Sequence, residues 1–234
     1  MHWQTTPRRL PLRGRTRIVL EGVTGAGKSS VIGALRESGR LPACFVSEDE
    51  TFGDAMLEVG QPGFRRRLTE VCARFASGPT GQGLPEEILI ERFHLSYYAQ
   101  EPVRSRPPVN LLGAASRETA GSLPEEPDWT PYQVFDDWLL GGGFSVVVLA
   151  ISEERLRERS LLRREFGGTD WQGFVPHFGS EANALEALRT SQARRIEALE
   201  KSRVRSLVVN TDSEAWVSIA AQIAAFGNLA GGGK

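Results

Sequence analysis

The sequence predicts an α/β fold of three layers, with a parallel sheet of about five strands and helices on both of its faces. Short apolar runs alternate with stretches of helical apolar spacing across residues 17–226. This alternation favours a parallel sheet, because each helix carries the chain back across one face to the start of the next strand. A second observation, a glycine-rich stretch directly after the first apolar run, predicts where the fold binds a ligand.

The glycine-rich stretch at residues 22–29 fits the pattern of a phosphate-binding loop: glycine, any four residues, then Gly-Lys-Ser. Residues 17–20 are predicted as the strand before it and residues 30–38 as the helix after it, with Gly39 as a stop signal. Glycines let backbone N–H groups wrap closely around phosphate oxygens, and a helix N-terminus favours an anion. The residues expected to bind the phosphates are Gly22, Thr24, Gly25, Ala26, Gly27, Lys28, Ser29 and Ser30.

Two side chains of this loop have expected chemical roles. Lys28, which we expect on a solvent-facing loop, would bridge the terminal phosphates and take part in catalysis. The hydroxyl of Ser29 would hold Mg²⁺. The pattern therefore predicts ATP and Mg²⁺ as the cofactors.

Composition and charge limit the classes of partner. The net charge of −1 gives no general attraction to nucleic acids or acidic membranes. Two cysteines, Cys44 and Cys72, provide neither a disulfide framework nor a metal-binding spacing, and we expect buried thiols in a reducing compartment, the cytoplasm. No run approaches the roughly 18 apolar residues of a membrane-spanning helix. The expected partner is a small molecule, without nucleic acid or membrane, and a homodimer is kept open.

The chain of 234 residues is expected to form one domain between two tails. Residues 1–16 are rich in proline and arginine and are predicted as a flexible basic tail, and residues 227–234 as a flexible C-terminal tail. Residues 17–226 would form the domain. Within it, residues 101–131 are rich in proline, glycine and charge, which predicts a long irregular insertion with one short helix at most.

The second apolar run, residues 43–47, is predicted as a strand and ends in Glu48, Asp49 and Glu50. In an open parallel sheet, the carboxyl ends of the strands face the ligand crevice. We expect Glu48, the first acid, to orient or deprotonate a substrate hydroxyl. Along an extended chain Asp49 would point away from Glu48, whereas Glu50 would share its side. A charged loop in water is the alternative for each of the three.

The third apolar run, residues 88–92, is predicted as a strand, followed by a helix over residues 93–100. Its end resembles the thymidylate kinase motif of an acid, an arginine and an aromatic residue, then two residues, a serine, two residues and an alanine. It equally resembles the Glu-Arg-Ser motif of deoxynucleoside kinases. The matching residues are Glu91, Arg92, Phe93, Ser96 and Ala99.

This resemblance implies the P-loop NTPase fold and roles for two residues. Arg92 would bind the 5′ oxygen or phosphate of the acceptor, and Glu91 would help to hold Mg²⁺ and to place Arg92. A strand-end ion pair without catalytic function is the alternative for both. His94, one residue further on, is expected to be an exposed or satisfied histidine.

The apolar run 144–151 is predicted as a strand covered on both faces. A segment rich in arginine follows it. Ser152 is expected to cap the next helix, and Arg155, Arg159 and Arg163 to lie along one face of it. The resembled kinases have a helical lid here, about residues 152–180, whose arginines close over the phosphates. The resemblance implies that Arg159 and Arg163 bind the donor phosphates and act in catalysis.

The alternative is a solvated helix, in which Arg155 and Arg157 pair with Glu154 and Glu158. Further along, residues 181–202 are predicted as one long helix, 204–210 as the last strand, and the turn at 211–213 as the start of a final helix. In the resembled kinases, the loop after this last strand lies beside adenine.

Two departures from the resembled families leave the acceptor open. Thymidylate kinases usually carry an aspartate where Thr24 stands, and deoxynucleoside kinases a proline where Asp49 stands. The sequence therefore predicts an ATP- and Mg²⁺-dependent phosphotransferase acting on a hydroxyl or phosphate of a nucleoside, a nucleotide or a nucleoside-like molecule. The same chemistry on an antibiotic or a sugar-like metabolite is one alternative. A P-loop ATPase or GTPase switch acting on a protein partner is another.

Overall fold

The structure is a computed structural model that describes residues 16–51, 61–76, 84–104, 128–161 and 179–227. Its centre is a five-stranded sheet in which all neighbouring strands run parallel, in the order β2-β3-β1-β4-β5. The strands are β1 (Thr16–Gly22), β2 (Cys44–Val46), β3 (Glu87–Glu91), β4 (Ser145–Ala150) and β5 (Arg205–Asn210). The predicted number of strands and their parallel arrangement are confirmed.

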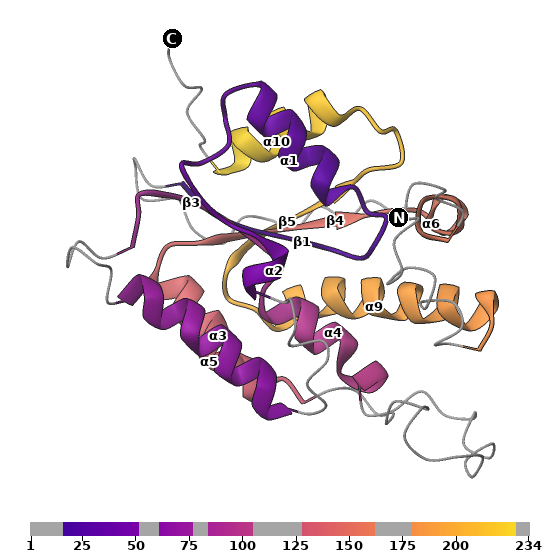
Figure 1. The fold of residues 1–234 in the computed structure, drawn as a ribbon, viewed down its shortest axis with the longest axis horizontal. Helices are drawn as coiled ribbons and strands as arrows, with labels where there is room; N and C mark the ends of the chain where they lie inside the picture. Colours follow the sequence, from indigo (N-terminus) through magenta and orange to yellow (C-terminus); the bar gives the residue numbers. More distant parts are fainter. Residues whose placement is uncertain (1–15, 52–60, 77–83, 105–127, 162–178, 228–234) are drawn as a thin grey trace.

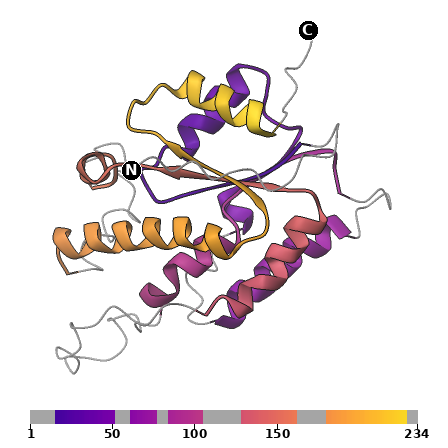
Figure 2. The ribbon, with the colours of Figure 1, turned by 180° about the vertical axis from the view of Figure 1, so that it is seen from behind.

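Helices cover both faces of the sheet, which confirms the predicted three layers. On one face lie α1 (Lys28–Glu37) and α10 (Trp216–Gly227), which pack against each other. The opposite face is covered by α3 (Gln61–Ala76), α4 (His94–Arg104), α5 (Thr130–Gly141) and α9 (Glu181–Lys201). Figures 1 and 2 show these two helical layers from opposite sides. Two short helices, α2 (Glu48–Thr51) and α6 (Glu153–Ser160), follow β2 and β4.

The side chains of the central strand alternate between two apolar cores. Val19 belongs to the core beneath α4, α5 and α9, whereas Ile18 and Leu20 belong to the core beneath α1 and α10. All three are fully buried. Burying a side chain of this size contributes about 1.5–3 kcal/mol, so both layers stabilise the strand that carries the glycine-rich loop. The loop is thereby held at the carboxyl edge of a rigid sheet.

Several predicted boundaries are wrong. The acids after β2 form the one-turn helix α2 and not an extended segment. The predicted irregular insertion, 101–131, is helical at both ends, because α4 continues to Arg104 and α5 starts at Thr130. Its middle, 105–127, lies outside the described residues, as do the tails 1–15 and 228–234. Cys44 and Cys72 are half-buried, and no disulfide joins them. No helix in the described ranges is long and apolar enough to cross a membrane.

Candidate active site

The glycine-rich loop connects β1 to α1 and has a backbone that requires glycine at two positions. Gly25 and Gly27 have φ of 84° and 92°, in the left-handed region that glycine adopts without strain. A Cβ at Gly25 would overlap the hydroxyl of Ser160, and a Cβ at Gly27 would overlap the ring of Trp216. Gly27 precedes α1 and has no side chain that could cap its first N–H groups. These groups therefore face the loop, where they suit an anion.

Lys28 is the first residue of α1, and its side chain is buried, which corrects the expectation of a solvent-facing lysine. Its Nζ lies 3.4 Å from the carbonyl oxygen of Gly22 and 3.6 Å from a carboxylate oxygen of Glu48. Burial, reinforced by the positive charge of Arg92, lowers the pKa of Lys28 to about 8. A bound phosphate would supply the opposite charge that this buried ammonium group needs.

Glu48 lies between two cations at the carboxyl end of β2. One of its carboxylate oxygens is 3.6 Å from Lys28 Nζ, and the other is 2.9 Å from Arg92 Nε. Although burial opposes it, the charges of Arg92 and Lys28 hold the pKa of Glu48 below its ordinary value. The carboxylate is therefore ionised at neutral pH and reaches the phosphate-binding loop.

The helical form of α2 separates the three acids, which corrects the argument from an extended chain. Successive residues of a helix are turned by about 100°, so Glu50 points away from Glu48. Glu50 instead accepts a hydrogen bond from the backbone N–H of Ser47 and forms an ion pair with Arg74. Asp49 is exposed. Glu48 is therefore the acid of this cluster that contacts Lys28.

The helix α2 is tied to β3 and α4 by a residue that the sequence argument missed. Thr51, which is fully buried, donates a hydrogen bond of 2.7 Å from its hydroxyl to the carbonyl of Glu91. The phenol of Tyr97 donates a 2.7 Å hydrogen bond to the carbonyl of Thr51. A single helical turn has little stability of its own, so these tertiary contacts hold Glu48 in place.

Glu91 and Arg92 end β3 beside the glycine-rich loop, as predicted. Glu91 is paired in register with Leu20 on β1, and burial raises the pKa of its carboxyl. Arg92 has a φ of 58°, and its backbone N–H donates to the carbonyl of Leu20 at 2.9 Å. A non-glycine residue in this region costs about 1–3 kcal/mol, and such residues cluster at functional sites. The turn directs the buried Arg92 side chain at Glu48.

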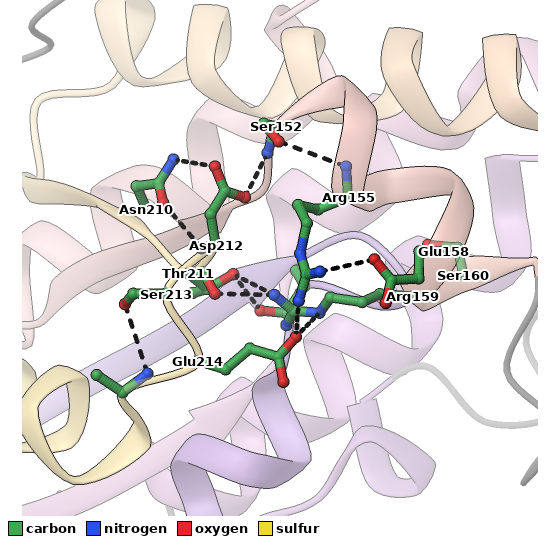
Figure 3. Close-up of polar contacts among 12 residues, drawn as sticks. Ser152, Arg155, Glu158, Arg159, Ser160, Asn210, Thr211, Asp212, Ser213 and Glu214 are labelled. Carbon is green, nitrogen blue, oxygen red and sulfur yellow. Dashed lines mark hydrogen bonds and ion pairs between the residues drawn. The ribbon is translucent and has the colours of Figure 1, made fainter.

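The arginines predicted along one face of α6 lie in different places: Arg159 at the glycine-rich loop and Arg155 near the surface. Arg159 is buried, and its Nη1 donates a 2.8 Å hydrogen bond to the carbonyl of Thr211. Its Nη2 lies 2.8 Å from the position that a Cβ on Gly27 would take, and its guanidinium lies 4.9 Å from the centre of the Trp216 ring. Arg155 pairs with Glu158 and Glu214 near the surface, and Glu214 also lies 3.9 Å from Arg159 Nε (Figure 3).

The solvated-helix alternative thus describes part of α6. The predicted pairing of Arg155 with Glu158 is present, but Arg157 pairs with Glu181. Arg163 lies outside the described residues, together with 162–178 of the predicted lid. Ser152 caps α6 as predicted, since its hydroxyl accepts from the N–H of Arg155. The other end of α6 rests on the glycine-rich loop, where the Ser160 hydroxyl donates a 2.7 Å bond to the carbonyl of Thr24.

Sequence reasoning missed a buried ion pair beneath the site. Glu21, the residue before Gly22, and Arg195 on α9 are both fully buried. Glu21 directly follows the apolar run 18–20 of its strand. Arg195 falls seven residues after Leu188, in line with the apolar side chains of its helix. Charged residues are rarely fully buried unless they are paired, so both positions carried a signal that could have been used.

Of the two expectations for His94, the exposed histidine is wrong. It is fully buried at the start of α4, and its Nε2 lies 3.5 Å from a carboxylate oxygen of Asp136 on α5. Its ring packs against Trp129 and Phe93. We therefore assign His94 to the packing of α4 on α5 and not to the ligand site.

Comparison with known proteins identifies the fold. No family model matches the sequence, and no curated protein matches it. Among solved structures, the YorR protein of Bacillus subtilis, in complex with phosphorylated GDP, is 15% identical with a TM-score of 0.54, covering 92% of this chain and 96% of that one. A shikimate kinase of Bacteroides thetaiotaomicron is 16% identical with a TM-score of 0.51, covering 92% and 99% of the two chains. A thymidylate kinase of Candida albicans is 13% identical with a TM-score of 0.51, covering 91% and 90%. The chain has the fold of the P-loop kinases.

This P-loop kinase fold brings most of the predicted site residues to one edge of the sheet. Ser29 is exposed at the start of α1, and Thr24, Ala26 and Ser30 lie in the loop and the first turn. The resemblance drawn from the motifs is confirmed at the level of the fold. The roles of the individual residues, including Gly22 at the head of the loop, stay predictions.

The site suits a nucleotide phosphate and a magnesium ion. The left-handed backbone at Gly25 and Gly27 and the buried ammonium of Lys28 suit phosphate oxygens. Among the described residues, no group of three or more His, Cys, Asp or Glu side chains could hold a metal by itself. Mg²⁺ usually takes one or two protein ligands and completes its shell with water and phosphate oxygens. Ser29 and Glu91 stay the predicted protein ligands of the ion.

Proposed function

We propose that the protein is an ATP- and Mg²⁺-dependent kinase that transfers the γ-phosphate to a hydroxyl group of a small, nucleoside-like molecule. The observation that carries this proposal is the Glu48 carboxylate, held 3.6 Å from Lys28 Nζ and 2.9 Å from Arg92 Nε. An ionised carboxylate beside the phosphate-binding lysine can accept the proton of an attacking hydroxyl. An acceptor phosphate in the same place would be repelled by it.

Each residue has a role in this reaction. The loop N–H groups and Lys28 hold the donor phosphates, and Arg92 binds the acceptor beside its reacting oxygen. Glu48 accepts the hydroxyl proton as the acceptor oxygen bonds to the γ-phosphorus, whose bond to the ADP oxygen breaks. Arg159 and Arg163 would stabilise the charge on the transferring group. Mg²⁺, held by Ser29 and Glu91, would neutralise phosphate charge when bound.

The comparisons support phosphotransfer to a small molecule in general terms. Two of the similar structures are named as kinases, one for shikimate and one for thymidylate, and a third was solved with phosphorylated GDP. At 13–16% identity these likenesses concern the fold, so the nucleoside-like acceptor depends on the Glu91-Arg92 motif. Two half-buried cysteines without a disulfide fit a reducing compartment such as the cytoplasm.

The test is a phosphotransfer screen with ATP, Mg²⁺ and a panel of nucleosides, nucleotides, hydroxylated metabolites and aminoglycoside antibiotics. We expect a phosphorylated product with a nucleoside-like alcohol, and near-complete loss of product with Lys28→Ala. The matched control is Arg36→Ala, which removes an exposed positive charge from the other end of the same helix. ATP consumption that needs no added acceptor would overturn the proposal in favour of an ATPase. Product with nucleotides and not with nucleosides would overturn the hydroxyl acceptor.

A further inference from the structure

The carboxylate of Glu21 caps a helix that belongs to another part of the chain. Glu21 stands on β1, yet its Oε1 accepts hydrogen bonds from the backbone N–H groups of Phe93, at 2.8 Å, and Ser96, at 3.3 Å. Its Oε2 accepts from the Ser96 hydroxyl at 2.5 Å. Phe93 precedes α4 and has no side-chain oxygen, so it cannot cap the helix itself. Glu21 supplies the missing acceptor from the neighbouring strand.

Arg195 completes this arrangement from a third element, α9. Its Nε lies 3.6 Å from Glu21 Oε2, and its Nη2 donates to the Ser96 hydroxyl at 3.2 Å. Its Nη1 donates to the Ser191 hydroxyl at 2.5 Å. The pair is fully buried, and a buried ion pair is weak support for a fold because both charges have lost their hydration. Its presence directly beneath the site therefore calls for a role other than stability.

The backbone of Arg92 is held from the same strand that carries Glu21. Leu20 accepts the N–H of Arg92 through its carbonyl, and Glu21 accepts the next N–H, that of Phe93, through its side chain. Two consecutive residues of β1 thus fix two consecutive amides of the turn. The left-handed φ of Arg92, 58°, lies between these two contacts. This conformation is disfavoured for arginine, so it persists only where its surroundings impose it.

We propose that Glu21, supported by Arg195, is a positioning residue for Arg92: it fixes the turn that directs the Arg92 guanidinium at Glu48 and the acceptor. The proposal rests on the proposed function for what Arg92 binds, but not for how Arg92 is held. Glu21 itself has no exposed surface, so an acceptor in the site would not reach it directly. Glu21 acts by holding the backbone amide of Phe93, and this amide fixes the position of the preceding residue, Arg92.

The first experiment reads the position of Arg92 without any substrate. Protein labelled with ¹⁵N-arginine gives an Nε–H cross-peak for each ordered guanidinium, and the peak lost in Arg92→Lys identifies Arg92. In Glu21→Gln the amide oxygen can still accept from backbone N–H groups, but the NH₂ group that replaces the second oxygen cannot accept from Ser96 and opposes the donors of Arg195. We expect the Arg92 peak of this variant to move toward the position of exposed arginines. An unchanged Arg92 peak in folded Glu21→Gln would overturn the proposal.

A matched control separates positioning from the loss of a buried charge. Arg17→Gln removes a buried, hydrogen-bonded charge from the other end of the same strand, where Arg17 donates to the carbonyls of Leu84 and Pro85. We expect it to lower the unfolding temperature and to leave the Arg92 peak in place. If Glu21→Gln does not fold, Ser96→Ala decides, because it keeps both charges and removes the hydroxyl that donates to Glu21 and accepts from Arg195. A shift of the Arg92 peak in this variant supports the proposal, and an unchanged peak overturns it.

The second experiment is kinetic and uses the acceptor found in the phosphotransfer screen. In Glu21→Gln we expect kcat/KM for the acceptor to fall on the order of 10- to 100-fold, because small displacements of a positioning group have effects of this size. The KM for ATP is expected to stay unchanged. Equal losses for ATP and acceptor would overturn the proposal, as would normal kinetics. If no acceptor is found, the proposed function fails, while the cross-peak experiment still tests how Arg92 is held.

Discussion

At the scale of single residues, Lys28 combines burial with positive charge, which makes its protonation sensitive to pH. Burial lowers the pKa of Lys28 from 10.5 to about 8 in the folded protein, so the free protein loses this charge as pH rises through about 8. We therefore predict that the dissociation constant for ATP rises between pH 7 and pH 9. Titration calorimetry at each pH measures it, with Lys28→Arg as the control that stays charged. A flat profile in the wild type would contradict the prediction.

The lowered pKa of Lys28 also makes the stability of the fold depend on pH. Between about pH 8 and 10.5 the unfolded chain keeps the Lys28 proton and the folded chain does not. The contribution of Lys28 to the free energy of unfolding therefore rises with pH in this window. Below about pH 8 both states hold the proton, and the buried charge stays a cost to the fold, which bound phosphate would offset. The buried charge of Lys28 therefore lowers the stability of the free protein, and a bound anion would recover this loss.

Glu48 is the residue on which the proposed chemistry depends. Removing a general base typically lowers the rate by about 10²- to 10⁴-fold, so Glu48→Gln should lose that much kcat with little change in ATP affinity. Asp49→Asn is the matched control, because Asp49 is the exposed neighbour on the same turn. Steady-state kinetics of both variants test the assignment. A large loss of kcat in Asp49→Asn would assign the general base to Asp49 and not to Glu48. Normal rates in both variants would make Glu91 the candidate base.

Arg92 is predicted to need its guanidinium and not merely its charge. Arg92→Lys should fail in acceptor binding, because an ammonium group cannot reproduce the planar fork that pairs with Glu48 and reaches the acceptor. Separate measurement of KM for the acceptor and for ATP tests this, with an increase expected for the acceptor. Arg74→Lys, at the half-exposed pair with Glu50, is the conservative control. An effect confined to the KM for ATP would assign Arg92 to the donor.

At the scale of elements, the spacing of apolar residues was enough to predict the strands and the helices α1, α9 and α10. The apolar side chains that these elements bury recur at regular intervals along the sequence. It was not enough for α2, whose single turn exists through the contacts of Thr51 with Glu91 and Tyr97. Nor could spacing tell that Arg155 and Arg159, on one face of α6, meet different surroundings. Both contact the loop after β5, but only Arg159 also lies beside Gly27 of the glycine-rich loop, which is distant in the sequence.

The element α6 supplies a prediction that distinguishes a phosphate-binding helix from a solvated one. Arg159 lies against the glycine-rich loop, whereas Arg155 pairs with acids near the surface. We predict that Arg159→Ala lowers kcat more than ATP affinity, by up to about 10³-fold, since arginine contacts tighten as charge shifts in phosphoryl transfer. Arg155→Ala, on the same helix, should be nearly normal. Normal turnover in Arg159→Ala would assign this arginine to its structural contacts with Thr211 and Trp216.

At the scale of the whole molecule, the site divides into two sides that meet at Lys28 and Glu48. In the proposed reaction, the donor would bind the glycine-rich loop, α6 and the loop 211–214. The acceptor would bind α2, the end of β3 and the start of α4. Sequence order did not reveal this division, because the order β2-β3-β1-β4-β5 depends on which strands pair across the sheet. The paired strands put residues 48 and 92 on one side of the loop and residues 159 and 211 on the other.

This division predicts the pattern of hydrogen exchange on binding ATP. The donor side is linked by hydrogen bonds from Ser160 to the carbonyl of Thr24 and from Thr211 to the carbonyl of Ala26. Order imposed on the loop by phosphate should therefore spread to its two neighbours. We predict that ATP with Mg²⁺ slows amide exchange in residues 22–29, in α6 and in the loop 211–214 together, and leaves α2 and the first turn of α4 unchanged. Lys28→Ala at the same ATP concentration is the control and should show no protection. Protection confined to residues 22–29 would mean that α6 and the loop 211–214 pack on the phosphate loop without responding to its ligand.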